Sequence, residues 1–415
     1  MEGFFTKKEA ESVSRPDGRA LSCISCGLYK HCTNAKMQPF GKCEKKIMII
    51  GEAPTQTDDQ RNLPFQDNTG KLLQRTLSKL GINLFEDCVT LNTTACYTPS
   101  EPTIYNIESC RRFVLQAIKD FKPKVIILLG KAPLFSVIGH RWKKDLDNIN
   151  KWRGFTIPDQ DYGAFICPTF SLTQIGRSLI DRFGKAKAFS VEQVLWESDL
   201  EQAIQMVDEP FRRYKEPTIT YMDDLSGFAE YIGKTELAAI DYETTALKPH
   251  ASRQKIVTAS VAKNKDEVCV FPFPQDKYAQ RPFVRFLLNS RIFKMAHNMK
   301  FEENWSIVKL GVGVTNWYMD TMISTHIIDN RSYITGLKFQ TYVQFGIIDY
   351  SSEIEPYLKG LDSKDANSTN RIEEFMEMQG GTKKVLTYNA LDSIYEYRLA
   401  LLQQKVMNYN FDLPF

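Results

Sequence analysis

The chain has 415 residues, of which 43% are hydrophobic and 25% are charged, and its formal net charge is +3. These values are typical of a globular protein with a sizeable core, and the length favours two domains. The near-neutral charge excludes steering by bulk charge, so nucleic-acid binding would need local basic patches. No apolar run reaches the roughly 18 residues of a membrane span. Residues 1–20 lack the apolar core of a signal peptide, so we expect a cytoplasmic protein that does not bind membranes.

Cysteines are concentrated in the first half of the chain. The chain has nine, and all but Cys269 lie between Cys23 and Cys167. In a reducing compartment, clustered cysteines favour metal or cluster binding over disulfides. The asymmetry indicates two domains of different chemistry.

The first half alternates apolar strands with helical stretches. We predict strands at 46–50, 88–92 and 124–129, and helices at 71–80 and 109–121. Strands that alternate with helices predict a parallel α/β sheet, in which ligands bind at the carboxyl ends of the strands. Those ends carry Glu52, Asn92 and Gly130.

The pattern divides the chain into four parts. We expect an N-terminal extension at 1–20, a cysteine-rich domain at 21–190, a helical linker at 191–216 and a second domain at 217–415, with the boundary at Glu216-Pro217. In the second domain we predict strands at 218–221, 237–241, 255–262 and 267–271, a helix at 225–233, and helices over most of the remainder.

Three segments of the second domain carry acidic residues in suggestive positions. Asp241 and Glu243 alternate along an apolar strand, so both carboxylates point to one face. Tyr388 and Asp392 share a helical face at i and i+4. Each of these pairs is common in ordinary structure when it occurs alone.

The remaining segment places Asn298 and Glu302 one predicted helical turn apart. Carboxylates brought together from distant segments repel one another unless cations lie between them. Hard oxygen ligands favour Mg²⁺ or Mn²⁺. Two such ions about 4 Å apart would clamp the attacking and leaving oxygens of a phosphoryl displacement. Together the three segments predict a two-metal nuclease.

The three motifs DYETTAL, HNMKFE and YNALD resemble those of the proofreading exonuclease domain of family A DNA polymerases. The resemblance extends from about Pro217 to Met407. It implies the DEDDy branch of the ribonuclease H-like (DnaQ-like) fold. The implied activity is a 3′→5′ exonuclease that releases deoxynucleoside 5′-monophosphates from DNA with a 3′ end.

The same resemblance assigns roles to individual residues. Asp241 would bridge both metal ions, Glu243 and Asp392 would hold the first, and Tyr388 would orient the attacking water. Glu302 stands where the family usually has Asp, and its longer arm would still reach the second ion. Two substrate contacts are implied as well, a wedge against the last base and a contact to the terminal nucleotide: Leu247 and Asn298.

The cysteine-rich half contains a tight pair, Cys23-x-x-Cys26, with Cys96 and Cys110 far downstream. Four thiolates suit structural zinc or an iron–sulfur cluster. Two further cysteines leave the choice of ligands open: Cys32 and Cys43.

The segments CISCGLYKHC, IIGEAPT, LPFQDNTGKLL, LNTTACYTPSEPTIYNIESCRRF and KPKVIILLG resemble, in order, the family 4 uracil-DNA glycosylases. The resemblance covers about Cys23 to Arg177. It implies a [4Fe–4S] cluster, with zinc as the alternative, held by four cysteines: Cys23, Cys26, Cys96 and Cys110.

That family flips uracil out of the duplex into a pocket. By resemblance, Glu52 is the acid of the first motif, Phe65 stacks on uracil and Asn92 reads the base edge. The competing interpretations are core packing for Phe65 and a strand-end cap for Asn92.

Three departures from the glycosylase pattern predict impaired excision. Thr55 replaces a glycine at which backbone should approach the ligand. Gln66-Asp67 adds a carboxylate near the expected pocket. Ser171 replaces the histidine that would stabilise the uracil anion, and a neutral hydroxyl does this less well than a preorganised imidazole.

The sequence therefore predicts a 3′→5′ DNA exonuclease fused to a glycosylase-like domain that holds DNA or a partner. Residues 393–415 are too few for a polymerase palm, so we expect a DNA polymerase in trans. The architecture resembles the front portion of some bacteriophage DNA polymerases, which implies a phage origin and the host cytoplasm. The alternatives are a bifunctional repair enzyme with active uracil excision and a non-enzymatic replication scaffold or processivity factor.

Overall fold

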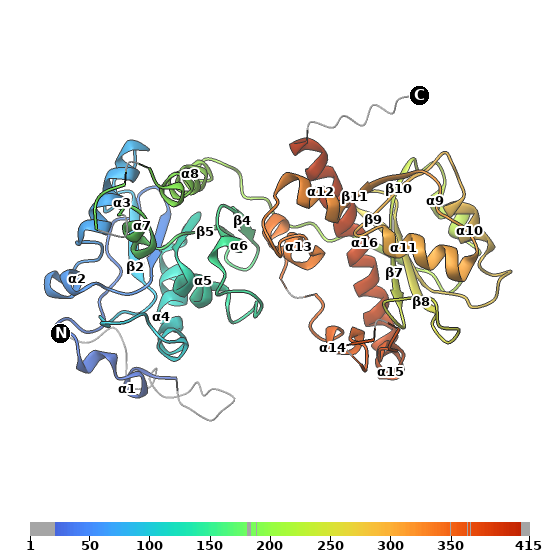
Figure 1. Cartoon of the computed structure of the whole chain (residues 1–415), viewed down its shortest axis with the longest axis horizontal. Helices are drawn as coiled ribbons and strands as arrows, with labels where there is room; N and C mark the ends of the chain where they lie inside the picture. The colour runs from blue at the N-terminus through green and yellow to red at the C-terminus, as the bar shows by residue number, and fades with distance from the viewer. Residues whose placement is uncertain are drawn as a thin grey trace. The chain divides into compact units, whose positions relative to one another are not determined.

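The computed structural model describes residues 21–180, 184–187, 189–348, 350–362, 364–365 and 367–407. It divides into two compact units (Figure 1). The first contains the chain up to Arg213 together with Tyr342–Ile347, and the second contains Tyr214–Thr341 and the chain from Ile348 onward. Among the described residues, every helix is too short or too polar to cross a bilayer.

The first unit is built on a five-stranded sheet with the order β2-β1-β3-β5-β4. Its central strands pair in parallel, and β4 is antiparallel to β5. The strands β1, β3 and β5 are buried throughout because both faces of the sheet are covered. The bounds are β1 (Ile47–Gly51), β2 (Cys88–Asn92), β3 (Val125–Leu129), β4 (Ile157–Asp159) and β5 (Ala164–Thr169).

Helices connect these strands, and their starts are fixed by capping side chains. The predicted helix at 71–80 begins earlier, because the Asp67 side chain accepts from the backbone N–H of Gly70. The helix predicted over 191–215 ends at Gln205, so the second half of the predicted helical linker is wrong. The helices are α1 (Cys23–Cys26), the 3₁₀ turn η1 (Leu28–Lys30), α2 (Gln56–Arg61), α3 (Asn68–Lys79), α4 (Ile104–Phe121), α5 (Lys131–Ile138), α6 (Ile149–Trp152), α7 (Leu172–Ser178) and α8 (Val191–Gln205).

The second unit contains a six-stranded sheet with the order β11-β10-β7-β8-β9-β6. β7, β8 and β9 pair antiparallel, whereas β10 is parallel to both β7 and β11, and β6 is parallel to β9. The bounds are β6 (Thr218–Tyr221), β7 (Leu237–Thr244), β8 (Ile256–Ala262), β9 (Glu267–Pro272), β10 (Phe293–Ala296) and β11 (Trp317–Asp320).

One long helix, α16 (Gly381–Val406), crosses β7, β8 and β9. The opposite face of the sheet packs an aromatic core that includes Phe228, Phe271 and Phe283. The other helices are α9 (Phe228–Ile232), α10 (Arg281–Leu287), α11 (Lys300–Trp305), the π-helical turn η2 (Ser306–Leu310), α12 (Thr321–Ile328), α13 (Leu337–Phe345), α14 (Glu355–Leu358) and α15 (Ile372–Glu377). The two helix-covered sheets confirm the predicted α/β class.

Candidate active site

Three carboxylates meet between β7 and α16. Ligand oxygens of Asp241, Glu243 and Asp392 all lie within 4.8 Å of one another. The alternation of β7 places Asp241 and Glu243 on the face that α16 covers, and Tyr242 points into the aromatic core behind it. The sequence predicted this meeting, although Asp392 follows Asp241 by 151 positions.

Asn389 fixes the position of Asp241. Its fully buried side-chain amide donates to Oδ2 of Asp241 and, at 3.2 Å, to the backbone carbonyl of the same residue. Thr258 Oγ1 donates to Asn389 Oδ1 at 3.0 Å, and Ser260 Oγ donates to the Asn389 carbonyl at 2.8 Å. These bonds fasten α16 to β8 and hold one carboxylate oxygen of Asp241 in a defined direction.

The group is electrostatically costly without a cation. Burial raises the pKa of Asp241 to about 8, and the charge of Asp392 contributes. Burial, with Asp241 and Asp392 nearby, also raises the pKa of Glu243 well above its usual range. Closely spaced carboxylates are therefore suited to hold divalent ions, which remove this repulsion.

Glu302 lies in the first turn of α11 and is not part of the group of three. It is 2% exposed, and its Oε2 has no hydrogen-bond partner in the described part of the chain. Burial raises the pKa of its carboxyl well above the usual range, and Asp241 is the largest charge contribution. An unpartnered buried carboxylate oxygen beside Asp241 fits a second cation.

Asn298 does not lie on a helical turn with Glu302, so that prediction is wrong. It precedes α11 and has φ +71°, in the left-handed region that asparagine tolerates better than most residues. The Asp320 carboxylate holds this turn by accepting from the backbone N–H groups of Asn298 and Met299 at 3.1 and 3.0 Å. Asn298 and Leu247, which is 67% exposed, line one surface pocket of about 380 Å³.

Two side chains that the sequence analysis did not identify contact Asp392. The Lys338 ammonium on α13 forms an ion pair with Asp392 Oδ1, and Tyr350 donates its hydroxyl to the same oxygen at 2.6 Å. The ammonium also lies 4.1 Å from the ring centroids of both Tyr350 and Tyr388. No periodicity marks a single lysine in GLKFQ, so only the fold brings it to the site.

Glu396 is a further acid that the sequence analysis passed over. It follows Asp392 by one turn on α16, is 1% exposed, and has an unpartnered Oε2 among the described residues. Burial raises its pKa well above the usual range, with charge contributions from Asp241 and Glu302. The i, i+4 spacing after Asp392 was the available signal.

In the first unit, the four predicted cluster cysteines converge from α1, the loop after β2, and α4. The pKa of the buried Cys110 thiol is raised to about 12, mainly by burial, and its other causes include Cys26, Cys23 and Cys96. Asn106 Nδ2 donates to Cys26 Sγ at 3.3 Å. The backbone N–H of Lys36 donates to Cys96 Sγ at 3.4 Å. Hydrogen bonds to ligand sulfur are a feature of iron–sulfur sites.

The two further cysteines differ in their relation to this group. The Cys32 thiol donates to the Tyr29 carbonyl at 3.7 Å and interacts with Cys96. Cys43 lies apart from this group, and its thiol donates to the Ile47 carbonyl at 3.6 Å.

Glu52 and Ser171 meet at the carboxyl end of the first sheet. Burial and the charge of Glu101 raise the pKa of the Glu52 carboxyl, and the nearby Ser171 hydroxyl acts in the opposite direction. Gly130, with φ +108°, lies between them, and a Cβ there would be 2.6 Å from Glu52 Oε1. Ser171 also caps α7 by accepting from Gln174 N at 3.2 Å.

Phe65 and Asn92 converge on Gly51. A Cβ at Gly51 would lie 2.3 Å from Asn92 Oδ1 and 3.0 Å from the Phe65 ring. Phe65 has φ +57°, an unusual backbone conformation for an aromatic residue, and Gln74 Nε2 donates to its carbonyl at 3.0 Å. Strained backbone of this kind is concentrated at functional sites.

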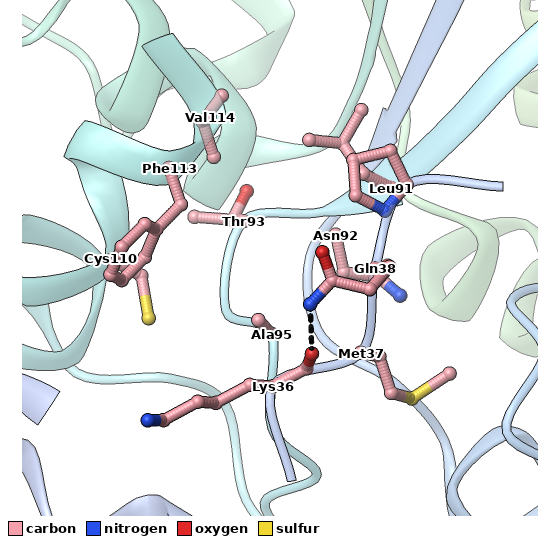
Figure 2. Close-up of a pocket in the computed structure, with 11 residues that line it drawn as sticks. Lys36, Met37, Gln38, Leu91, Asn92, Thr93, Ala95, Cys110, Phe113 and Val114 are labelled. Carbon is pink, nitrogen blue, oxygen red and sulfur yellow. Dashed lines mark hydrogen bonds between the residues drawn. The ribbon is translucent and has the colours of Figure 1, made fainter. Parts of the chain in front are cut away.

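The cavity in Figure 2 has Asn92 in its lining but not Phe65. It lies between Asn92, Cys110 and the segment Lys36–Pro39, where Gln38 Nε2 donates to the Lys36 carbonyl at 2.8 Å. Its volume is about 30 Å³, enough for a water molecule and far below the 300 Å³ or more of typical ligand pockets. A flipped base therefore does not fit there.

Thr55 and Asp67 have structural roles. Thr55 caps α2 and has φ −76°, so it needs no glycine-like backbone. Asp67 caps α3, and its carboxylate accepts from Gly70 N at 2.8 Å and Thr69 Oγ1 at 2.9 Å. The Asp67 carboxylate therefore has a structural reason to be present that is independent of the base pocket.

The fold and these groups define a glycosylase-like unit followed by a nuclease unit. Residues 38–183 match the Uracil DNA glycosylase superfamily, and residues 217–405 match a 3′-5′ exonuclease family. The chain belongs to the uracil-DNA glycosylase superfamily through its first unit, and its second unit is a 3′→5′ exonuclease domain of the DNA polymerase A type. Both predicted resemblances are confirmed.

Individual relatives cover the first unit. A type-4 uracil-DNA glycosylase of Thermotoga maritima is 30% identical over 197 residues, which cover 45% of this chain and 97% of that protein. The type-4 enzymes of Pyrobaculum aerophilum and Archaeoglobus fulgidus are 33% and 32% identical, and the chain spans 64% and 56% of their lengths. These alignments cover 30% and 27% of this chain.

Among solved structures, Escherichia coli RNase D is similar with a TM-score of 0.33 and 14% identity, over 46% of this chain and 44% of that one. Brucella melitensis NrnC is similar with a TM-score of 0.32 and 18% identity, over 46% and 82%.

Proposed function

We propose that the second unit is a two-metal-ion exonuclease that acts on DNA 3′ ends and releases deoxynucleoside 5′-monophosphates. The observation that carries the proposal is the group of Asp241, Glu243 and Asp392, with ligand oxygens within 4.8 Å. Among the described residues, Lys338 is the cation that pairs with this group, and one positive charge does not neutralise three buried carboxylates. Their chemistry suits Mg²⁺ or Mn²⁺.

Each residue has a role in this proposal. Asp241 would serve both ions, Glu243 and Asp392 would hold the first, and Glu302 would hold the second through its unpartnered Oε2. The bound ions would stabilise charge on the attacking and leaving oxygens. Tyr388, one turn before Asp392, orients the attacking water. The substrate end is held by two residues of one surface pocket, Leu247 and Asn298.

The test is degradation of 5′-labelled single-stranded DNA in Mg²⁺ or Mn²⁺, read as shortening from the 3′ end. Asp241→Ala should abolish shortening, and Glu374→Ala, an exposed acid of α15, should leave it unchanged. Absence of 3′ shortening by the wild type in both metals would refute the proposal. Loss of activity in Asp241→Ala would exclude the alternative of a non-enzymatic scaffold.

For the first unit we propose a DNA-binding or docking role with impaired uracil excision and a [4Fe–4S] cluster on Cys23, Cys26, Cys96 and Cys110. The impairment rests on Ser171, whose hydroxyl caps α7 and is near enough to Glu52 to act on the pKa of that carboxyl. A hydroxyl committed in this way offers little stabilisation to a departing uracil anion.

A second candidate function is active uracil excision, which would make the chain a bifunctional repair enzyme. The convergence of Phe65 and Asn92 on Gly51 favours it, because these side chains keep a geometry that suits a flat base. A uracil-containing oligonucleotide treated with alkali decides between the two. Strand breakage above that of Glu52→Ala supports excision, and equal breakage supports impairment.

We further propose that a DNA polymerase works with this chain in trans, in bacteriophage DNA replication within a host cytoplasm. The support is the combination of an exonuclease domain of the DNA polymerase A type with a glycosylase-like unit. Co-purification with replication proteins tests it. The proposal fails if no polymerase co-purifies and misincorporation stays the same when the chain is added.

A further inference from the structure

Lys338 places a positive charge inside the carboxylate group. Its Nζ forms an ion pair with Asp392 Oδ1. It also donates to the Tyr350 hydroxyl oxygen at 3.0 Å. Its positive charge also lowers the pKa of Asp241 and of Glu243, against the larger effect of burial, which raises both. One ammonium therefore offsets part of the repulsion among all three acids.

The ammonium is held by more than the ion pair. It lies 4.1 Å from the ring centroids of both Tyr350 and Tyr388, whose own centroids are 6.0 Å apart. A cation between two aromatic faces gains electrostatic stabilisation from both rings. The two tyrosines give the ammonium a place within the site even when it does not bond to a carboxylate.

Asp392 Oδ1 has two lone-pair sites, and Lys338 and Tyr350 occupy both. A metal ion bound directly to this oxygen, at about 2.0–2.1 Å, would therefore have to displace one of these donors. We propose that Lys338 is an internal counter-ion of the acidic site, which competes with the first metal ion for Asp392 and keeps only its contacts with the tyrosine rings when the ion binds. The inference rests on the proposed exonuclease function, because it concerns the same metal site.

The first measurement is Mn²⁺ binding to the full-length protein without DNA, by calorimetry and electron paramagnetic resonance. Only the binding that Asp241→Ala removes is counted. Lys338→Met should bind the first Mn²⁺ about tenfold more tightly than wild type, because a charged hydrogen bond no longer competes. Lys338→Arg keeps the charge and should bind more weakly than Lys338→Met.

The matched control is Lys384→Met, because Lys384 pairs with a carboxylate of the surface residue Glu353, outside the site. Its Mn²⁺ affinity should equal that of wild type. A structural role for Lys338 would lower or preserve the affinity on substitution, and either result in Lys338→Met overturns the proposal.

The second measurement is thermal unfolding in EDTA and in Mn²⁺. Lys338→Met should melt below wild type in EDTA, because the acids lose their counter-ion, and should recover in Mn²⁺. Equal melting temperatures in EDTA would overturn the proposal. If Lys338→Met does not fold, Lys338→Gln is expected to show the same two effects.

Failure of this inference and failure of the proposed function are separable. A wild type that shortens DNA while Lys338→Met binds Mn²⁺ with unchanged affinity defeats only the inference. A wild type that shortens no DNA, together with tighter Mn²⁺ binding by Lys338→Met, defeats only the proposed function.

Discussion

The Asn389 side-chain amide donates to both the carboxylate and the backbone carbonyl of Asp241. A residue of α16 thus orients a residue of β7 that lies 148 positions earlier in the chain. Because Asp241 is the proposed shared ligand, its direction determines where both ions can lie. Substitution of a residue that orients a metal ligand commonly lowers the metal affinity or the activity.

Asn389→Ala should lower exonuclease kcat/KM by about 10- to 100-fold, the usual effect of losing a partner that orients a ligand. The Mn²⁺ affinity should fall with it, while the folded state persists. Steady-state kinetics and calorimetry check both. Unchanged values in a folded variant would show that Asp241 keeps its direction without the amide.

Glu302→Gln should reduce the number of bound Mn²⁺ ions from two to one, because the unpartnered Oε2 loses its charge. The first ion, held by Asp241, Glu243 and Asp392, should bind with nearly normal affinity. Calorimetric stoichiometry is the measurement. If the variant still binds two ions, an acid other than Glu302 holds the second ion, and Glu396→Gln is then the next substitution to make.

Ser171→His should raise uracil excision above the wild-type level, because an imidazole beside Glu52 can stabilise the leaving uracil anion. Ser171→Ala serves as the control, since it removes the hydroxyl without adding an imidazole. Alkali-sensitive strand breaks in a uracil-containing oligonucleotide give the readout. Equal breakage by both variants would mean that the histidine is not the missing element.

Cys110→Ser should remove iron and the broad absorbance near 400 nm from the purified protein, because a cluster needs its fourth thiolate. Cys43→Ser is the matched control, since its thiol lies against the Ile47 carbonyl, away from the cluster cysteines. Metal analysis and absorbance check the prediction. Stoichiometric zinc in the wild type would contradict it.

Lys294 supplies a pH-dependent test of the second unit's core. It is fully buried on β10, and burial lowers the pKa of its ammonium to about 8. Between that value and the unfolded value of about 10.4, the unfolded chain binds more protons. The free energy of unfolding of wild type relative to Lys294→Met should therefore rise between about pH 8 and 10.

Urea unfolding of wild type and Lys294→Met at several pH values measures both free energies of unfolding. Subtracting one from the other removes the contribution of the other titrating groups. A difference that stays flat from pH 8 to 10 would show that Lys294 keeps an ordinary pKa in the folded state.

Periodicity predicted the strands best. The predicted bounds of β2 and β6 are the observed ones, and the alternation of Asp241 and Glu243 followed directly from strand geometry. Helix starts were missed where capping side chains set them, as at Asp67. Asn298 was misplaced because its positive φ depends on bonds from its backbone to Asp320, far along the chain.

The acids of the site were predictable because their motifs carry local patterns. Lys338 and Tyr350 were not, since each is a single residue in a segment without periodicity and reaches Asp392 only through the fold. Thr55 and Asp67 were interpreted as damage to a pocket, although both cap helices. A substitution relative to a family pattern can therefore serve local structure alone.

The two-sided pattern of β7 restricts which insertions and deletions the gene can tolerate in this strand. Its carboxylates and the core residue Tyr242 differ only in which side of the strand they occupy. One inserted or deleted codon between Leu237 and Ile240 would exchange the two sides, burying acids among phenylalanines and turning Tyr242 toward α16. A codon-by-codon indel scan should find this stretch intolerant, whereas length changes in the connection at 250–253, before β8, should survive selection.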